Sequence, residues 1–513
     1  MLAPDFSSTI WNHALHGNTE EVCKLLDQGY STNQGDEHGQ APLYLAAKGG
    51  HLHTTELLLT RGALVDQLKD NGSTALSVAA FQGHDSILRL LLERGAEVDH
   101  VNDEGNTPLM FAVQQGHLHI VELLQYLGAD ILHANADGAT PLHFAAHHGH
   151  LDVVEWLLAQ GAEVDQTISA EDSTPLQLAV EQGHLDIVRL LLKHTDPSNI
   201  VNLGSILLTF AAQAGHLEIV RHLLDCGADI NYRGYLGETA LFIAAFEGDI
   251  RIVELLLERN ALVYLVEAGA GSSPLFVAAQ EGHLQIVEEL IDQGGADVNQ
   301  YRESDEWTPL MIAIDEEHDA VAERLLRHGA NYNLRSIDGM TPLGMAATAG
   351  SDSIVQMLLE YGSDVEAKIG VHAETALELA RQADHASVVD LLKSAEGAFT
   401  DACAGRVERF RDAIVSGKFP APIMQWGPYI PPPAWNQLLS WVSASLADSR
   451  ACYAALFHST DGDVVDSKLT LRAVTHDGFL HIRRVLISYL VFPKESTRRL
   501  LREVAAYGLS SQE

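Results

Sequence analysis

The chain has 513 residues, of which 46 % are hydrophobic, and a formal net charge of −38. It is apolar enough to fold and too long for a single globular core, so we expect several packed units. An acidic surface repels nucleic acid and anionic membranes, and no window approaches the roughly 20 apolar residues of a membrane helix. These properties exclude a nucleic-acid-binding protein and a membrane protein.

The cysteines and the start of the chain indicate a reducing compartment. Cys23, Cys226, Cys403 and Cys452 lie far apart, without a C-x-x-C pair. This usage is not typical of a disulfide framework or a zinc module. Residues 1–10 lack the basic start and apolar run of a signal peptide. We expect a soluble monomer in the cytoplasm, with the nucleus left open.

A motif of the form T-P-L-x-x-A-A recurs along the chain at intervals of 32 to 35 residues. Self-similarity at this period is typical of a solenoid. The first alanines of the successive copies are Ala14, Ala46, Ala79, Ala112, Ala145, Ala179, Ala211, Ala244, Ala278, Ala313, Ala346 and Ala380.

The clearest copy, residues 138–165, predicts two short helices and a turn. Thr140 can cap a first helix that begins with proline. Ala145 and Ala146 are small, so the two helices of one repeat can approach closely. Gly149 ends the first helix, and the apolar face that follows predicts a second helix ending at Gly161. One such unit cannot bury its apolar faces alone, whereas stacked neighbours can.

At this point the chain resembles the ankyrin-repeat family, over residues 7–396, because the period and the T-P-L-H-x-A signature both match. The resemblance implies an all-α ankyrin-repeat solenoid of about twelve helix-turn-helix units with a concave side. We assign it to residues 1–399, with atypical first and last repeats, and expect no catalytic activity. Repeats six to ten depart from the consensus, which we attribute to a reshaped binding face or to simple drift.

In this family, partners contact the hairpin tips and the two positions before the glycine that closes the first helix. Carried onto this chain, the resemblance implies partner-binding residues on the helices at Phe81, His147, His148, Glu181, Phe246, Glu247, Glu281, Asp315 and Glu316. At the hairpin tips it implies Tyr232, Tyr235, Tyr301 and Trp307.

Together these residues predict a face over repeats six to ten that is acidic at its floor and aromatic at its rim. Residues 1–399 hold 19 Lys+Arg against 59 Asp+Glu, a net of −40. We therefore expect a protein or peptide partner rich in Lys and Arg. Two alternatives stay open: the acidity serves solubility alone, and the aromatic rings pack against neighbouring hairpins.

The 26 histidines do not predict a metal centre. Seven of them, His51, His84, His117, His150, His184, His216 and His283, follow glycine at one point of the repeat. Equivalent points on stacked helices are about 8–10 Å apart, too far to share an ion. These histidines are better explained by hydrogen bonds to the backbone between repeats. Among His143, His147 and His148, which lie on one helix, residues i and i+4 share a helix face. The sequence places no third ligand beside such a pair. No phosphate-binding loop or nucleophile motif occurs, so we expect no cofactor.

After residue 395 the period stops. Residues 400–433 predict a capping helix and a proline-rich linker, and residues 434–513 predict a small helical C-terminal module with a basic face. This module either docks on the acidic repeats or acts as an adaptor. In the second case the chain would be the substrate-recognition subunit of a ubiquitin ligase, with the module recruiting the ligase.

Overall fold

The computed structural model describes residues 9–168, 173–196, 199–370 and 372–403. The chain divides into two compact units, Met1–Tyr232 (unit 1) and Arg233–Glu513 (unit 2). Each is described by itself. Twenty-four helices form twelve consecutive pairs in these residues, and no strand occurs among them apart from one isolated bridge between Ile369 and Glu374. The predicted all-α repeat solenoid is thereby confirmed.

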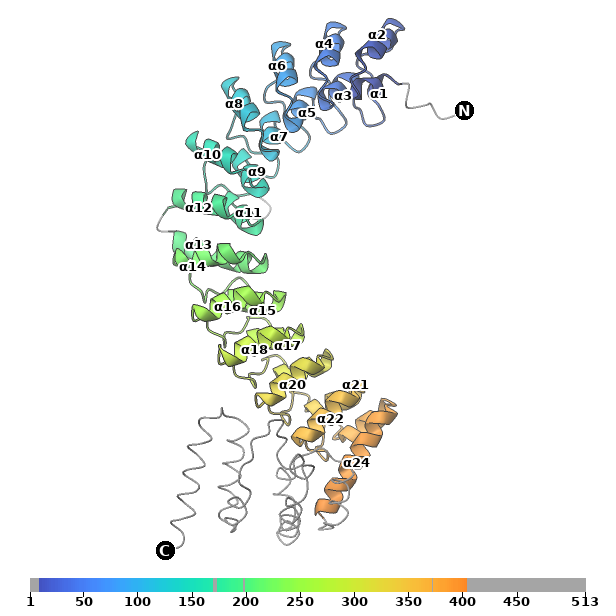
Figure 1. Cartoon of the computed structure of the whole chain (residues 1–513), viewed down its shortest axis with the longest axis vertical. Helices are drawn as coiled ribbons and strands as arrows, with labels where there is room; N and C mark the ends of the chain where they lie inside the picture. Colours follow the sequence, from blue (N-terminus) through green and yellow to red (C-terminus); the bar gives the residue numbers. More distant parts are fainter. Residues whose placement is uncertain (1–8, 169–172, 197–198, 371, 404–513) are drawn as a thin grey trace, which may run out of the picture. The chain divides into compact units, whose positions relative to one another are not determined.

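Unit 1 contains fourteen helices in its described residues (Figure 1). They are α1 Ile10–Leu15, α2 Thr19–Asp27, α3 Pro42–Lys48, α4 Leu52–Thr60, α5 Ala75–Gln82, α6 Asp85–Glu93, α7 Pro108–Gln114, α8 Leu118–Tyr126, α9 Pro141–His148, α10 Leu151–Ala159, α11 Pro175–Glu181, α12 Leu185–His194, α13 Ile200–Gln213 and α14 Leu217–Asp225.

Unit 2 contains ten helices in its described residues. They are α15 Ala240–Glu247, α16 Ile250–Glu258, α17 Pro274–Gln280, α18 Leu284–Asp292, α19 Pro309–Asp315, α20 Asp319–Arg327, α21 Pro342–Ala349, α22 Asp352–Tyr361, α23 Ala376–Gln382 and α24 Ala386–Cys403.

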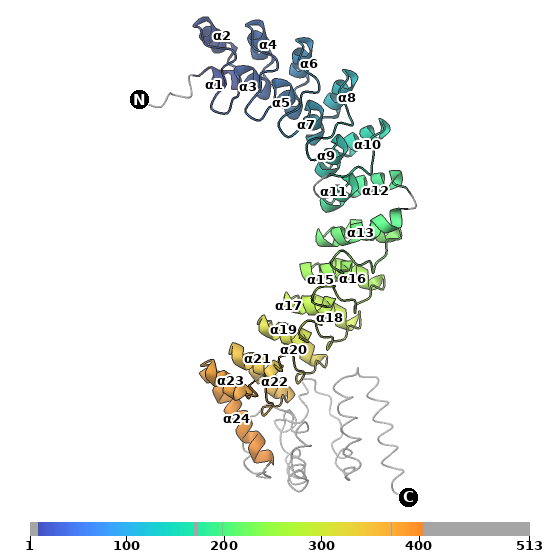
Figure 2. The ribbon, with the colours of Figure 1, turned by 180° about the vertical axis from the view of Figure 1, so that it is seen from behind.

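Within each unit the odd-numbered helices stack on one another in a row, which we call the inner helices, and the even-numbered outer helices form a second row (Figures 1 and 2). Most inner helices begin where Thr or Ser accepts a hydrogen bond from the third residue of the helix, as Thr107 does from Met110, whereas α3 and α13 begin without such a cap. The alanine pair of each motif is fully buried, as at Ala145 and Ala146. Small side chains there let the two rows approach closely.

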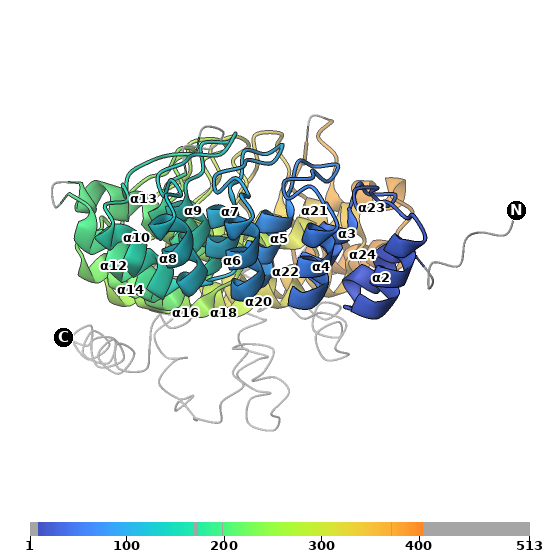
Figure 3. The same ribbon diagram turned by 90° about the horizontal axis from the view of Figure 1, so that it is seen from above.

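The loops that join successive repeats form hairpins that project to one side of the helices (Figure 3). Neighbouring tips are linked by single backbone hydrogen bonds. In unit 1 the N–H of Asp103 donates to the carbonyl of Asn71 at 3.1 Å, and the N–H of Ala136 donates to that of Glu104 at 3.0 Å. The tips within a unit therefore form a continuous edge that a partner can contact.

Two helices differ from the expected bounds. Helix α13 has 14 residues and begins without Thr-Pro. Helix α24 continues through Asp401, where the sequence predicts a new helix to begin. Within the described residues no helix combines the length and apolar character needed to cross a membrane. The linker and C-terminal module predicted for residues 404–513 lie outside the described residues.

Candidate partner-binding surfaces

Histidines link the inner helices of neighbouring repeats. In unit 1, six imidazoles donate a hydrogen bond from Nε2 to a carbonyl at the end of the preceding inner helix, at 2.9 to 3.3 Å. The pairs are His51–Leu15, His84–Lys48, His117–Phe81, His150–Gln114, His184–His147 and His216–Glu181. Unit 2 repeats the contact in His283–Phe246, His318–Gln280 and His385–Thr348. The backbone role predicted for the histidines that follow glycine is confirmed, and His318 and His385, which do not follow glycine, make the same contact.

His143 also has a structural role. Its Nδ1 accepts from the backbone N–H of Thr140 at 3.1 Å, and its Nε2 donates to the carbonyl of Gln166 at 2.9 Å. Burial of the ring lowers the pKa of His143, since the charged imidazolium loses hydration. The described residues contain no group of three His, Cys, Asp or Glu side chains that could hold a metal ion.

In unit 2, carboxylates lie at the C-terminal ends of three adjacent inner helices. Glu247 is the last residue of α15, Glu281 follows α17, and Asp315 and Glu316 end α19. The histidine bonds to Phe246 and Gln280 hold these ends side by side. All four carboxylates are exposed. We call Glu247, Glu281, Asp315 and Glu316 the acidic edge.

The acidic edge carries negative charge where the fold does not favour it. A helix C-terminus already bears partial negative charge on its free carbonyls, so a carboxylate there is destabilising. In the described residues no lysine or arginine forms an ion pair with these four side chains. Arginines of unit 2 pair elsewhere, as Arg324 does with Glu288 and Arg327 with Glu323 on the outer helices.

Exposed aromatic side chains lie on the loops and on helix α15 of the same unit. Tyr235 is fully exposed at a hairpin tip, at 101 % of its reference area, and Tyr301 is 54 % exposed. Phe246, beside the acidic edge, is 44 % exposed. Large apolar rings in water contribute little to folding and are typical of contact surfaces. The predicted combination of rings and carboxylates therefore occurs within unit 2.

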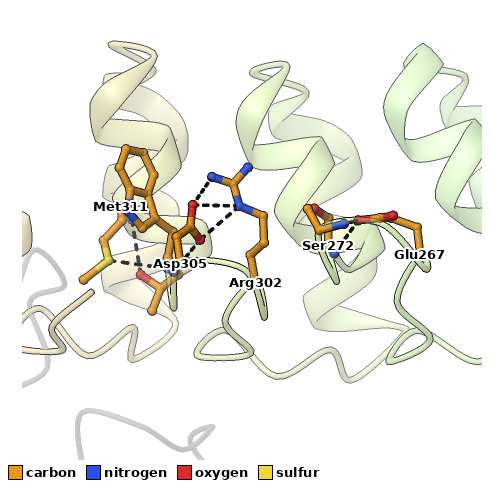
Figure 4. A network of polar contacts seen from close by, with 8 residues as sticks. Glu267, Ser272, Arg302, Asp305 and Met311 are labelled. Carbon is orange, nitrogen blue, oxygen red and sulfur yellow. Dashed lines mark hydrogen bonds and ion pairs between the residues drawn. The ribbon is translucent and has the colours of Figure 1, made fainter. Parts of the chain in front are cut away.

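Trp307 is placed differently, because its backbone N–H donates to Asp305, which forms a polar network with Arg302 of the same loop (Figure 4 shows Arg302 and Asp305). The Arg302 guanidinium donates to the Asp305 carboxylate and lies over the rings of Phe276 at 4.6 Å and of Trp307 at 5.6 Å. Burial alone would raise the pKa of Asp305, but hydrogen bonds from Arg302 and from the Trp307 N–H lower it. The Trp307 ring is thus partly buried against Arg302 of its own loop, whereas the alternative left open by the sequence was packing against a neighbouring hairpin.

The predicted residues of unit 1 form a less charged group. His147 and His148 are in contact, with ring centroids 4.7 Å apart. Glu181 accepts a hydrogen bond from Gln177 Nε2 at 2.9 Å. Phe81 packs edge-to-face on Phe111 at 6.3 Å.

Tyr232 is half-buried at the end of unit 1, on the loop where its N–H donates to the carbonyl of Asp229. This loop is the boundary of unit 1, and the acidic edge lies in unit 2. The residues predicted to form one face over repeats six to ten therefore fall into two groups, one in each unit.

Sequence reasoning missed a row of apolar side chains in unit 1. Phe111, Phe144, Leu178 and Phe210 lie on successive inner helices and are partly exposed. All four occupy the position directly before the alanine pair of the motif. The signal was available: three phenylalanines among four consecutive copies, at a position where smaller residues suffice elsewhere.

Comparison with known proteins agrees with this architecture. A family model of ankyrin repeats, which spans three copies, matches seven overlapping segments of the chain: residues 10–102, 67–135, 94–168, 161–234, 195–265, 259–336 and 325–402. Among curated proteins no match is found.

Proposed function

Because the chain belongs to the ankyrin-repeat family, whose repeats are protein-interaction modules and generally non-catalytic, we propose that it is a scaffold that binds a Lys/Arg-rich protein or peptide through unit 2. The contact surface is the acidic edge together with the exposed rings of Phe246, Tyr235 and Tyr301. The scaffold role follows from the family, and the basic partner follows from the charge of this surface.

One observation carries the proposal. The carboxylates of the acidic edge have no Lys or Arg ion-pair partner in the described residues and lie at helix ends whose dipoles oppose them. Such an arrangement lowers the stability of the free protein and is relieved when a cation binds. Basic side chains of a partner supply that cation, and the nearby rings supply contact area with little loss of side-chain entropy.

The test is a charge reversal in the full chain. We expect Glu247→Lys with Glu281→Lys to weaken binding of a fluorescent arginine-rich peptide about tenfold or more, which is about 1.4 kcal/mol. The matched control is Glu254→Lys with Glu258→Lys, the same change of charge on exposed positions of outer helix α16.

Salt provides a second readout. Binding to the wild-type chain should weaken between about 0.05 M and 0.5 M salt, because exposed charges are screened over a few ångströms at the higher concentration. If the two charge-reversal variants bind the peptide equally well, the acidic edge is not the contact and the proposal fails.

The ubiquitin-ligase alternative concerns residues 434–513, outside the described residues, and stays a prediction. Co-purification of cullin-type proteins with the full chain, lost on deletion of these residues, would support it. The monomeric state and the cytoplasmic location are likewise predictions, to be checked by light scattering and by fractionation.

A further inference from the structure

Unit 1 presents a second surface that the acidic edge does not explain. Five apolar side chains, which we call the apolar strip, lie on five successive inner helices: Phe81 on α5, Phe111 on α7, Phe144 on α9, Leu178 on α11 and Phe210 on α13. All five are partly exposed. These helices pack on one another in order, and Figure 2 shows them following one another along unit 1.

The fold does not require rings of this size at these positions. In unit 2, the residues directly before the alanine pairs of α17, α19 and α21 are Val277, Ile312 and Met345, and they are only 4 %, 4 % and 7 % exposed. The equivalent residues of α15 and α23, Ile243 and Leu379, are partly exposed. Val78 on α5 is likewise 7 % exposed. An aliphatic side chain therefore suffices for the packing at this position, and the larger phenyl rings of unit 1 present more apolar surface there while they stay partly exposed. A row of partly exposed apolar side chains on successive helices is typical of a contact surface.

The two borders of the strip differ in charge. On the side of the helix ends, the neighbouring side chains of α5 to α11 include one carboxylate, Glu181, and are otherwise uncharged and polar: Gln82, Gln114, Gln115, His147, His148 and Gln182. On the side of the hairpin tips the exposed residues are acidic: Glu37, Asp70, Asp103, Glu104 and Asp137. A partner that covers the strip therefore meets apolar side chains at its centre and most of the negative charge along one border.

The spacing of the strip selects the conformation of the partner. Packed helices lie about 8–10 Å apart, so the four side chains directly before the alanine pairs of α7 to α13 recur at that interval. Phe81 lies three residues further along its helix than this register, and its ring centroid is 6.3 Å from that of Phe111. An α-helix advances about 1.5 Å per residue, and its residues i and i+7 lie on one face about 10.5 Å apart. In a β-strand, residues on one face recur about every 6.7 Å, which does not keep step with the rings.

We propose that the apolar strip of unit 1 binds one amphipathic α-helix of a partner protein. The apolar stripe of that helix covers the rings of Phe81, Phe111, Phe144 and Phe210. Lysines and arginines along one flank of the helix face the acidic hairpin tips. This surface is separate from the acidic edge of unit 2, and binding to it does not depend on the function proposed for that edge.

The probe is a synthetic 22-residue peptide with leucine at each a and d position of a heptad pattern and lysine along one flank, labelled for fluorescence anisotropy. Two control peptides are a scrambled sequence of the same composition and one with glutamate in place of lysine. The protein is the full chain. The test variant is Phe111→Val with Phe144→Val, which introduces the residue that the fold uses at position 277.

We expect the wild-type chain to bind the amphipathic peptide at least about tenfold more tightly than either control peptide. The double valine variant should lose about tenfold in affinity while its thermal unfolding stays close to that of the wild type. Phe246→Gln and the pair Glu247→Lys with Glu281→Lys, all in unit 2, should leave this binding unchanged. Failure of the proposed function therefore does not affect this result.

Three results would overturn the inference: no binding of the amphipathic peptide, equal binding of the scrambled peptide, or unchanged binding to the valine variant. Equal binding of the lysine and glutamate peptides would also overturn it, since the acidic border would then have no role. A helical signal of the bound peptide in circular dichroism distinguishes the helix from an extended chain, and its absence contradicts the proposal.

Discussion

At the scale of single residues, two glycines of unit 1 share a backbone conformation but differ in their surroundings. Gly116, at φ 71°, would place a Cβ 2.5 Å from Nδ1 of His150, whereas Gly95, at φ 88°, has nothing within 4 Å of that position. A left-handed alanine costs about 1–2 kcal/mol at either site. Gly116→Ala must in addition displace the His150 ring and its hydrogen bond to Gln114.

We therefore expect Gly116→Ala to lower the free energy of unfolding by about 1–2 kcal/mol more than Gly95→Ala, from the loss of one buried hydrogen bond and its packing. Urea denaturation of the full chain and the two variants measures the difference. Equal losses would mean that the ring moves aside without cost and that the histidine contacts contribute little to repeat stacking.

The acidic edge gives a prediction of opposite sign. Glu247→Gln and Glu281→Gln remove a negative charge from a helix C-terminus, so each should raise the free energy of unfolding by about 0.3–1 kcal/mol. Thermal unfolding at low salt measures this gain. Glu254→Gln, in the middle of α16, is the control and should change stability less. A loss of stability in the first two variants would show that these carboxylates serve the fold.

Individual residues also mark what sequence reasoning can reach. The histidines that follow glycine were placed correctly, because a residue repeated at one register has one structural environment. Trp307 was predicted only as a tip aromatic, because its contact with Arg302 depends on how one irregular loop folds. Phe111, Phe144 and Phe210 were missed because the family pattern directs attention to the two positions before the glycine, not to the one before the alanine pair.

At the scale of elements, the contact between a glycine of one repeat and a histidine ring of the next is replaced at one place by a different pair of residues. Where Gly282 and Gly350 face the rings of His318 and His385, the equivalent pair in the repeat of α19 and α20 is Glu317 and Ser351. Glu317 has φ 59°, an unfavourable conformation for a residue with a side chain. A side chain fits there because the next repeat presents serine in place of an imidazole.

This pair predicts a double-mutant cycle. Glu317→Gly alone should stabilise the chain by about 1 kcal/mol, since glycine adopts the left-handed conformation freely. Ser351→His alone should destabilise it, because the new ring meets the Glu317 side chain. The two substitutions together should be more stable than the sum of their separate effects, by about 0.5–3 kcal/mol. Additive effects in urea unfolding would contradict the proposed link between the two positions.

Elements were predicted well where the motif is complete and poorly where it is not. Thr-Pro starts and glycine ends placed most inner helices. Helix α13 extends further toward its N-terminus than a Thr-Pro start would allow, because Ile200–Gly204 lies where the chain has neither Thr-Pro nor a glycine turn. Helix α24 runs to Cys403 and passes through Gly397, a residue at which the local rules would have ended it. Start and stop residues therefore predict the helix bounds of the regular repeats. Where these residues are missing or do not end the helix, packing determines the length of the helix.

At the scale of the whole molecule, the two units differ in the groups that respond to mild acid. Four histidines of unit 1, His117, His143, His148 and His222, have a lowered pKa, in each case chiefly because burial removes water from the charged form. In unit 2 the groups with lowered pKa include the carboxyls of Glu267 and Asp305, where hydrogen bonds from backbone N–H groups and from Arg302 outweigh burial.

The signs of these shifts set two pH windows. A histidine whose pKa is lowered binds protons less readily in the folded chain, so its contribution to stability is lost as the pH falls below the ordinary value of 6.5. A carboxyl whose pKa is lowered stabilises the fold above its ordinary value, 4.5 for glutamate and 3.8 for aspartate, and loses that contribution only below it. Between pH of about 7.5 and 5, therefore, these histidines weaken unit 1 while the carboxyls still support unit 2.

We expect hydrogen-exchange protection factors, corrected for intrinsic rates, to fall in α7 to α14 between pH of about 7.5 and 5 and to change less in α15 to α20. His143→Gln, which introduces the residue found at position 177 of the next repeat, should reduce the loss around α9 because it removes one buried titrating group. Equal losses of protection in both units, or an unchanged response in the glutamine variant, would mean that these buried histidines do not control the acid sensitivity of unit 1.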